Sequence, residues 1–327
     1  MARILARPEP RRLLTWPADA PRVGIHLGVA TGLLKAARRA RQIGATAIQI
    51  FSDNPTAWRR RLELPADADD FVAYAARAGV DQIAIHASYL INLAGSAEPS
   101  AGQSRAGLIH ELQSAPAFGA RYVNTHIGSH RGMGREAGIR RIAENVDAIL
   151  DDSPPGVILV LENAAGGGDT IGASLEELAA ILGAVSRGHD RLAFCLDTAH
   201  LWGAGYDMAS AEGASGVVDR FSELVGLEHL ALVHLNDSRS ERGSRTDRHE
   251  HLGAGRIGPQ GLGALLRDPR LARTTFVLET PGEDAGYDAV NLRRARLLYA
   301  GHTALPQLPP KAFKLNRRSS RVATPKG

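Results

Sequence analysis

Short apolar runs alternate with longer, more polar stretches along most of the chain. The apolar runs are rich in Val, Ile and Leu, as strands buried on both faces usually are. They predict strands at residues 22–27, 46–51, 81–86, 121–126, 157–162, 191–197, 230–234 and 274–279. The stretches between and after them predict helices at residues 31–43, 67–78, 104–118, 135–151, 174–186, 214–225, 259–266 and 289–299.

This regular alternation indicates the fold class and the domain limits. Strand–helix units in series are typical of α/β proteins with a parallel sheet, and eight of them favour a (β/α)8 TIM barrel over an open sheet. We expect one barrel domain over residues 21–303 and a flexible extension over residues 1–20. Residues 304–327 are Pro-rich and then basic, so we expect a disordered tail there.

Seven of the predicted strands end on a side chain that can bind a metal ion. The C-terminal ends of barrel strands share one face, where active sites are built, so these side chains should converge. Chance placement would not favour the same end of seven strands. The terminal residues are His26, His86, His126, Glu162, Asp197, His234 and Glu279.

The loops after the strands add further candidates. His200 follows the sixth predicted strand, and Asp247 and His249 follow the seventh. Imidazole and carboxylate groups suit zinc, and also manganese or iron. The expected ligand set is His86, His126, Glu162, Asp197, His200, His234, Asp247, His249 and Glu279. Nine ligands exceed the need of one ion, so several ions with a bridging carboxylate such as Glu162 are predicted, an arrangement suited to phosphate-ester cleavage.

Some polar residues have simpler interpretations. Any single strand-end His could be an ordinary hydrogen-bonded loop residue, and we expect His110, His130, His189 and His251 to be solvated loop residues. Residues 253–258 match GxGxxG, but they follow a polar loop and not a strand, so a nucleotide site is weakly supported.

The amino-acid composition bears on the cellular location of the protein. No apolar stretch is long enough to span a membrane, and residues 1–20 lack the pattern of a secretory signal. Cys195 is the only cysteine, which excludes an internal disulfide and a zinc site built from cysteines. A cytoplasmic location is therefore expected.

Charge is unevenly distributed along the 327 residues. The net charge is +4; residues 311–327 contribute +6 and residues 1–20 contribute +2, which leaves −4 for the body. A mildly acidic body argues against a simple basic DNA-binding surface, although bound divalent cations would reverse the local sign. The basic tail either binds DNA phosphates or is a solvated end without a role.

The spaced motifs closely resemble those of endonuclease IV-type apurinic/apyrimidinic endonucleases, in the xylose isomerase-like TIM barrel superfamily. The resemblance runs from about Gly24 to about Arg296. It rests on the order and context of HASYLINL at 86–93, LEN at 161–163, LDTAH at 196–200, GYD at 205–207, HLNDS at 234–238, DRH at 247–249 and LET at 278–280.

This resemblance implies a zinc-dependent DNA repair enzyme. One zinc ion would be held by His86, His126 and Glu162, a second by Glu162, Asp197, His234 and Glu279, and a third by His200, Asp247 and His249. A metal-bound hydroxide would attack the phosphodiester 5′ to an abasic site in double-stranded DNA and leave a 3′-hydroxyl, as in base excision repair. Glu162 and Glu279 would be catalytic, Tyr89 and Leu90 would contact DNA, and His26 and Asn236 are candidates for supporting the ligands.

We also expect a monomer without a membrane partner, and the ligand types allow Mn²⁺ or Fe²⁺ as alternatives to zinc at some metal positions. Three positions depart from the usual family pattern. Ala87 replaces an Asp beside the first ligand, and Ala164 replaces a Thr. Thr56 replaces an Arg that enters DNA at the lesion, a task that Arg59 or Arg60 could take over.

Two other functions fit parts of the pattern. A sugar isomerase or epimerase of the xylose isomerase-like type would use a single-metal site at Glu162, Asp197, His234 and Glu279. Such an enzyme has no need of the five other candidate ligands. A metal-stabilised DNA-binding protein without catalysis would use the basic tail, but the complete ligand set argues against it.

Overall fold

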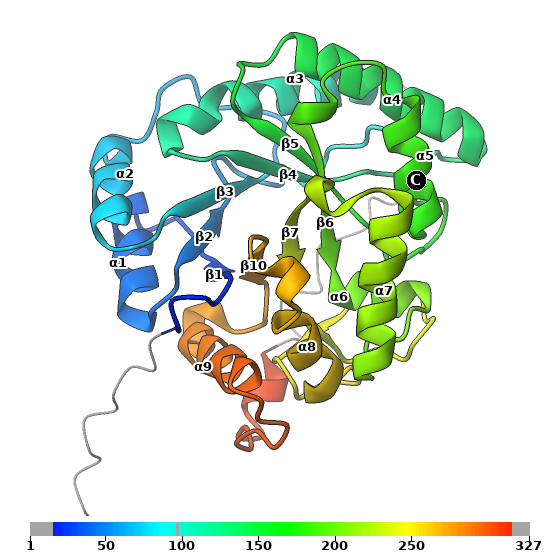
Figure 1. Ribbon diagram of the computed structural model, residues 1–327. Helices are drawn as coiled ribbons and strands as arrows, with labels where there is room; N and C mark the ends of the chain where they lie inside the picture. Colours follow the sequence, from blue (N-terminus) through cyan, green and yellow to red (C-terminus); the bar gives the residue numbers. More distant parts are fainter. Residues whose placement is uncertain (1–15, 96–97, 316–327) are drawn as a thin grey trace, which may run out of the picture.

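Eight parallel strands close into a barrel in the computed structural model, which describes residues 16–95 and 98–315 (Figure 1). Neighbours around the barrel follow the order β1-β10-β7-β6-β5-β4-β3-β2. The strands are β1 (Arg22–His26), β2 (Ala47–Ile50), β3 (Gln82–His86), β4 (Tyr122–His126), β5 (Ile158–Glu162), β6 (Leu192–Asp197), β7 (Leu230–His234) and β10 (Thr275–Leu278). The predicted TIM barrel is confirmed, with each strand close to its expected place.

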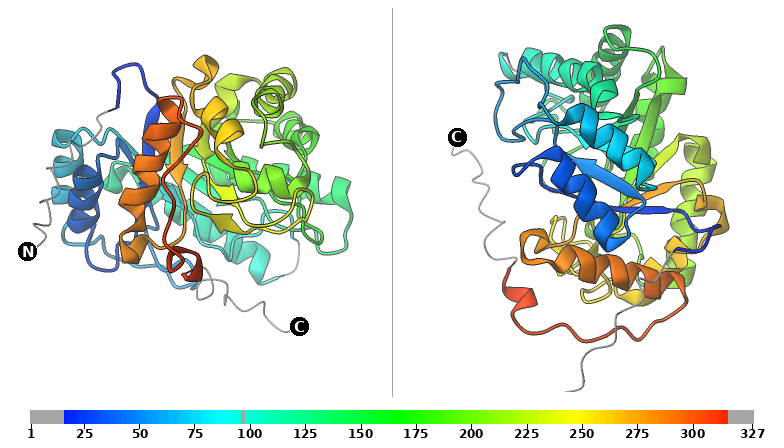
Figure 2. Two further views of the ribbon diagram at one scale, coloured as in Figure 1. Left: turned by 90° about the horizontal axis from the view of Figure 1, so that it is seen from below. Right: turned by 90° about the vertical axis from the view of Figure 1, so that its left-hand side faces the viewer.

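Helices surround this barrel (Figures 1 and 2). They are α1 (Leu33–Ile43), α2 (Ala68–Arg77), α3 (Ser100–Ser114), α4 (Arg135–Asp151), α5 (Leu175–Ala184), α6 (Thr198–Ala204), α7 (Ala211–Leu224), α8 (Pro259–Leu266) and α9 (Tyr287–Tyr299). The sequence did not predict α6, because seven residues are too few for a clear periodic pattern. Its start is marked instead by Asp197, whose side chain accepts hydrogen bonds from the backbone N–H groups of Ala199 and His200.

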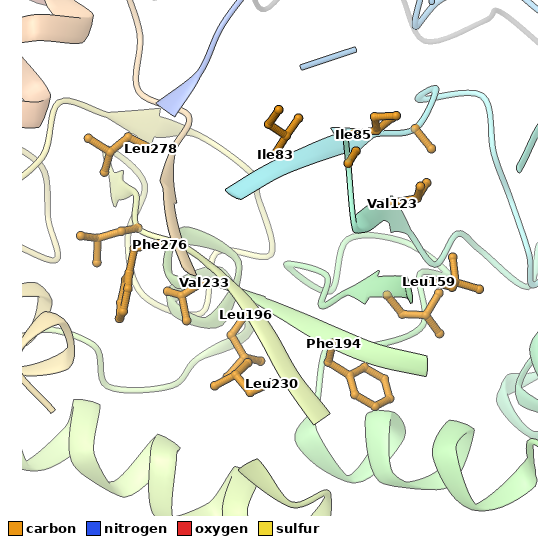
Figure 3. Packing of buried hydrophobic residues seen from close by; sticks show 14 of the residues in the cluster. Ile83, Ile85, Val123, Leu159, Phe194, Leu196, Leu230, Val233, Phe276 and Leu278 are labelled. Atoms are coloured by element: carbon orange, nitrogen blue, oxygen red, sulfur yellow. The ribbon is translucent and has the colours of Figure 1, made fainter. Parts of the chain in front are cut away.

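The core divides into two layers because successive strand residues point to opposite sides. Ile83, Ile85 and Phe194 belong to the large layer between strands and helices, part of which is seen in Figure 3. Ala84 and Cys195 belong to a small cluster formed by the alternate positions. The same period of two places the last residues of β3 and β6, His86 and Asp197, on the side of that small cluster.

Residues 304–315 differ from the expectation of a disordered tail. Ala312 is 0% exposed, and a short 3-10 helix spans Ala312–Lys314. The Pro306 carbonyl accepts a hydrogen bond of 2.7 Å from Arg294 Nη1. A Pro-rich composition predicted disorder, but Leu305, before the prolines, packs against the core, and Ala312, after them, is buried. Residues 316–327, the rest of the expected tail, lie outside the described residues.

The expected N-terminal extension is also packed where the structure describes it. Trp16 Nε1 donates a hydrogen bond of 3.2 Å to the Gly44 carbonyl, and the Arg296 guanidinium lies 5.3 Å from the centre of the Trp16 ring. The remainder of that expectation, residues 1–15, lies outside the described residues. Over the part of the chain that is described, none of the helices is both long and apolar enough to cross a membrane.

Candidate metal centre

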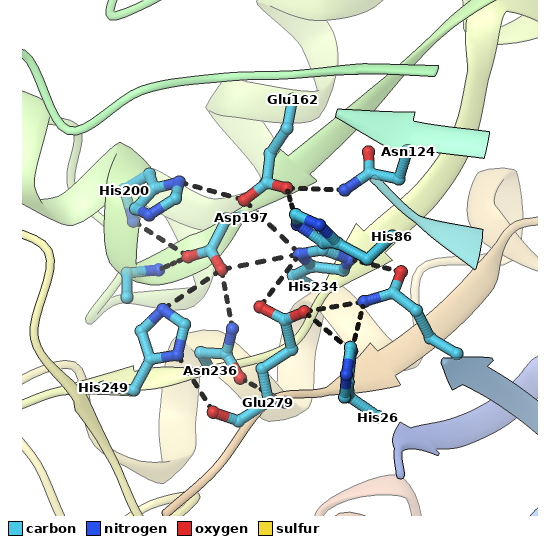
Figure 4. A network of polar contacts seen from close by, with 12 residues as sticks. His26, His86, Asn124, Glu162, Asp197, His200, His234, Asn236, His249 and Glu279 are labelled. Atoms are coloured by element: carbon cyan, nitrogen blue, oxygen red, sulfur yellow. Dashed lines mark hydrogen bonds and ion pairs between the residues drawn. The ribbon is translucent and has the colours of Figure 1, made fainter. Parts of the chain in front are cut away.

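Potential metal ligands gather at the end of the barrel where the strands terminate (Figure 4). Three groups each place their ligand atoms within 4.8 Å of one another. The groups are His86–His126–Glu162, Glu162–Asp197–His234–Glu279 and Asp197–His200–His249. Glu162 and Asp197 each belong to two groups, so the groups form one continuous cluster.

Glu162, the last residue of β5, lies at the centre of this cluster. Its side chain is 0% exposed, and its carboxylate oxygens lie 3.2–3.7 Å from imidazole nitrogens of His86, His126, His200 and His234. Asn124 Nδ2 donates a hydrogen bond of 2.6 Å to Glu162 Oε2. The other oxygen, Oε1, is buried and has no hydrogen-bond partner among the described residues. A buried carboxylate oxygen without a hydrogen-bond partner is suited to binding a cation.

Backbone carbonyls orient three of the imidazoles. The Nδ1 atoms of His86, His200 and His249 lie 2.8, 2.8 and 3.0 Å from the carbonyl oxygens of Ala87, Asn163 and Glu279. A proton on Nδ1 satisfies each carbonyl and leaves the Nε2 lone pair for a metal ion.

His234 has the opposite arrangement. Its Nε2 lies 3.0 Å from Gln49 Oε1, so a proton on Nε2 completes that hydrogen bond. Its Nδ1 lies 3.4 Å from Glu162 and 3.3 Å from Glu279, and it has no hydrogen-bond partner among the described residues. Gln49 therefore selects the nitrogen that faces the carboxylates.

Asp247 joins the cluster from a loop. Its carboxylate oxygens lie 3.3 Å from His200 Nε2 and 3.1 Å from His249 Nε2. The loop is closed by a hairpin of β8 (Asp237–Ser238) and β9 (His249–Glu250), two strands too short for the sequence pattern to predict.

The two candidates for supporting positions lie beside ligand carboxylates. Asn236 Nδ2 donates a hydrogen bond of 2.6 Å to Asp197, and Asn236 Oδ1 accepts one of 2.8 Å from the backbone N–H of Glu279. His26 Nδ1 lies 3.6 Å from Glu279 Oε1. Asn236 thus ties β6 to the end of β10.

Sequence reasoning missed several contributors to the site. Gln49 and Asn124 are buried polar residues inside β2 and β4, Asn163 directly follows β5, and each of the three contacts a candidate ligand. A polar residue inside an otherwise apolar strand was the available signal. Cys195 lies with Glu162 and His234 in a further group of potential ligands, so one thiol is at the cluster although no site is built from cysteines. Burial raises the pKa of this thiol to about 12.

Burial and charge act against each other in the cluster. Burial alone would raise the pKa of Glu162, but the neighbouring imidazoles, His234 first, hold that pKa well below its usual value. Burial alone would lower the pKa of His200, but Asp197 and Asp247 raise that pKa well above its usual value. The carboxylates are thus held ionised, and they stabilise positive charge on the neighbouring imidazoles. A bound metal ion would supply that positive charge in place of the protons on the imidazoles.

The candidate DNA-contacting residues lie at the rim. Tyr89 is 48% exposed, and its ring centre lies 5.2 Å from that of Phe51 and 6.1 Å from that of His126. Leu90 is partly buried, and the side chains of Thr56 and Arg59 are exposed. The suggestion that Arg60 replaces the missing arginine is wrong, because Arg60 is nearly buried and its Nη1 lies 3.3 Å from Glu111 Oε1. Arg59, whose side chain is exposed, is the remaining candidate for the role of the missing arginine.

The hairpin that carries Asp247 depends on one buried carboxylate. Asp237 is 0% exposed and accepts hydrogen bonds of 2.9 Å from the backbone N–H groups of Gly255 and Ile257, with Gly258 also in range. Asp237→Ala would leave these donors, of which Ile257 N–H is buried, without an acceptor, at about 1–3 kcal/mol for a buried group left unsatisfied. We expect the free energy of unfolding, measured in urea, to fall by at least about 2 kcal/mol. Asp237→Asn, which keeps one acceptor oxygen, should lose less; equal stability of all three proteins would contradict this role.

The fold and the ligand groups together define a TIM barrel with a metal-binding cluster at its mouth. The family described as "Xylose isomerase-like TIM barrel" matches residues 37–299. The protein named "Probable endonuclease 4" from Chloroflexus aurantiacus is 37% identical over 283 residues, covering 86% of this chain and 99% of the relative. Its counterpart from Natranaerobius thermophilus is 38% identical over 281 residues, with coverage of 86% and 99%.

Solved structures agree with this relationship. Endonuclease IV from Thermus thermophilus superposes with a TM-score of 0.75 at 39% identity, over 86% of this chain and 100% of that one. A D-tagatose 3-epimerase-like protein, with a TM-score of 0.62 at 16% identity, shares the fold alone. The chain belongs to the xylose isomerase-like TIM barrel family and, within it, to the endonuclease IV enzymes. The resemblance stated from the motifs and the prediction of an enzyme are both confirmed.

Proposed function

We propose that this protein is a DNA repair endonuclease that hydrolyses the phosphodiester 5′ to an abasic site and leaves a 3′-hydroxyl. The observation that carries the proposal is the continuous cluster in which Glu162 and Asp197 each serve two ligand groups. A site that shares carboxylates between groups is suited to several ions a short distance apart. Clusters of this kind are used in phosphate-ester cleavage.

The donor set fits three zinc ions, with Mn²⁺ or Fe²⁺ as alternatives at some positions. Imidazoles and carboxylates are ligands for all three metals. The buried Glu162 Oε1 and His234 Nδ1, both without a hydrogen-bond partner among the described residues, are atoms that a cation would satisfy. The ions would be held by His86, His126 and Glu162; by Glu162, Asp197, His234 and Glu279; and by His200, Asp247 and His249. When bound, they would activate the attacking water and stabilise the leaving oxygen.

The residues around the cluster would bind and position the substrate. A cavity of about 770 Å³ opens over the cluster and is lined by Tyr89, His126, His249 and Glu279, among others. In our proposal a sugar and its phosphate enter this cavity, and the exposed face of Tyr89 packs against the DNA beside the lesion with Leu90. Glu279 is fixed for its role by Gln49 Nε2, which donates a hydrogen bond of 2.6 Å to Oε1.

A cleavage assay tests this function. Purified protein supplied with zinc or manganese should cut a duplex with one tetrahydrofuran lesion immediately 5′ to that lesion, and a strong chelator should abolish cutting. The same duplex without the lesion is the control. Absence of cleavage with both metals would refute the proposal.

Metal analysis separates the nuclease from the remaining alternative. The four-residue group Glu162–Asp197–His234–Glu279 alone could serve a single-metal sugar isomerase. That alternative leaves His86, His126, His200 and His249 as buried or partly buried imidazoles without a metal to bind. About three ions per chain would favour the nuclease, and about one or two would favour the isomerase.

The proposal also covers the cellular compartment, the oligomeric state and the partner of the enzyme. We propose a cytoplasmic monomer whose barrel domain spans residues 21–303 and whose partner is damaged double-stranded DNA. The single, buried thiol of Cys195 supports a reducing compartment. Light scattering of the purified protein during chromatography would show a mass near 34.8 kDa for a monomer.

A further inference from the structure

Gln49, in β2, is a buried amide that contacts three side chains at the metal cluster. It is 0% exposed. Its Nε2 donates a hydrogen bond of 2.6 Å to Glu279 Oε1 and lies 3.1 Å from His26 Nδ1. Its Oε1 lies 3.0 Å from His234 Nε2. Both amide hydrogens and the amide oxygen of Gln49 therefore have a partner at the cluster, where His26 lies beside Glu279 (Figure 4).

The carboxylate of Glu279 fixes the orientation of this amide. An ionised carboxylate accepts hydrogen bonds and cannot donate them, so the amide nitrogen of Gln49 has to face Glu279 and the amide oxygen has to face His234. His234 then donates from Nε2, in agreement with the metal-facing role of its Nδ1. The second hydrogen of the amide nitrogen is left for His26 Nδ1.

His26 therefore accepts on Nδ1 and carries its proton on Nε2. A proton on Nδ1 would point at the amide hydrogens of Gln49, 3.1 Å away, and the other acceptor in that direction, Glu279 Oε1, is more distant at 3.6 Å. The Phe51 ring, whose centre lies 4.5 Å from that of His26, restricts rotation of the imidazole. The surrounding side chains thus determine both the tautomer and the orientation of His26.

The Nε2–H group of His26 is available to bind a further molecule. Among the described residues no group bonds to Nε2, and Nε2 is not one of the buried polar atoms that lack a partner. His26 lines the cavity of about 770 Å³ over the cluster, and 14% of its side chain is exposed. The wall of the cavity formed by β1 (Arg22–His26) therefore presents a neutral hydrogen-bond donor.

A donor at this position suits a phosphate oxygen. Asp247, Glu279 and Glu283 line the same cavity, and ionised carboxylates only accept hydrogen bonds. A phosphate group needs donors or cations around its oxygens, and hydrogen bonds to such a charged oxygen are strong. His26 lies beside Glu279, so an oxygen bound next to this candidate ligand is within reach of the imidazole.

We propose that His26 binds a phosphate oxygen of the substrate through Nε2–H, and that Gln49 positions His26 by fixing its tautomer. His26 is then a substrate contact and not only a support for the ligand Glu279. This inference rests on the proposed function for the identity of the substrate, but inorganic phosphate tests the same contact without DNA.

Nitrogen-15 NMR tests the tautomer in the zinc-loaded protein with labelled histidine. The signals of His26 are identified by their loss in His26→Asn. We expect the proton of His26 on Nε2 and none on Nδ1 at neutral pH. A proton on Nδ1 would overturn the proposal, because Nε2 would then be an acceptor facing a phosphate oxygen.

Two variants separate a substrate contact from support of the ligands. In His26→Asn the side-chain amide reaches about as far as Nδ1, so Gln49 keeps a partner and the donor to the cavity is lost. In His26→Gln the longer side chain reaches about as far as Nε2, so the donor to the cavity is kept and Gln49 loses its partner. His302→Asn is the control, since His302 is exposed and lies in the loop after α9. All three variants should keep the metal content of the wild type.

Binding is measured for two probes with zinc-loaded protein. Calorimetry gives the affinity for inorganic phosphate, and fluorescence anisotropy gives the affinity for a duplex with one tetrahydrofuran lesion. We expect His26→Asn to bind both probes at least about tenfold more weakly, because a hydrogen bond to a charged group is lost. His26→Gln should recover a large part of the lost affinity, and His302→Asn should bind like the wild type.

The reverse ranking would overturn the proposal. If His26→Asn binds phosphate like the wild type while His26→Gln loses metal or affinity, His26 acts through Nδ1 as a support for the ligands. If the wild-type protein binds phosphate through His26 but does not cut the duplex, the proposed function fails and the assignment of His26 stands.

Discussion

Glu162→Gln is expected to reduce cleavage of an abasic duplex by roughly 1,000-fold or more while the barrel stays folded. The carboxylate lies at the centre of the ligand cluster, within 3.2–3.7 Å of four imidazoles. An amide removes its negative charge and replaces one metal-binding oxygen with a donor. Metal ions contribute several kcal/mol of transition-state stabilisation, and each 1.36 kcal/mol corresponds to a factor of about ten in rate.

Single-turnover cleavage and metal analysis measure this effect together. Glu177→Gln is the matched control, because Glu177 is also a buried glutamate but accepts hydrogen bonds from backbone N–H groups at the start of α5, away from the cluster. It should retain close to the wild-type rate and metal content. A Glu162→Gln protein with the full metal content and near wild-type turnover would remove Glu162 from the mechanism.

The strand-end residues could be predicted from sequence because two regular patterns determine their positions. The alternation of strands and helices predicts the barrel, and the C-terminal ends of barrel strands share one face. His86, His126 and Glu162 are therefore brought together although they lie in different strands. The motifs around them then identified the family. No comparable rule gives the distances between ligand atoms.

Other parts of the site follow from contacts that a linear pattern does not contain. Gln49 selects the nitrogen with which His234 faces the carboxylates, through a contact between residues 185 positions apart. Arg60 is adjacent in sequence to the exposed Arg59, yet it turns inward because Glu111 offers a buried carboxylate. Residues 304–315 have a Pro-rich composition typical of disorder, but His251, which is buried and not solvated as expected, contacts the Ala312 carbonyl and Gly282 packs against Leu315. In each case tertiary contacts, rather than local preference, decide the outcome.

His200→Ala and His249→Ala should each remove about one metal ion per chain and most of the cleavage activity. Both imidazoles face Asp247, and His249 Nε2 also lies 3.4 Å from Asp197. Loss of either imidazole leaves the proposed third ion with one fewer ligand and leaves Asp247 without one of its two cationic neighbours. The ion pairs are partly exposed at Asp247, so we expect the barrel itself to keep its stability.

These two variants test the nuclease against the single-metal isomerase, because an isomerase site of Glu162, Asp197, His234 and Glu279 uses neither imidazole. Metal content is measured by elemental analysis after removal of loosely bound ions, and cleavage is measured on the same samples. His302→Ala is the control, since His302 is exposed and lies in the loop after α9. Unchanged metal content in both His200→Ala and His249→Ala would exclude a third ion at these residues. If both variants also retained full cleavage, the catalytic cluster would have to be restricted to His86, His126, Glu162, Asp197, His234 and Glu279.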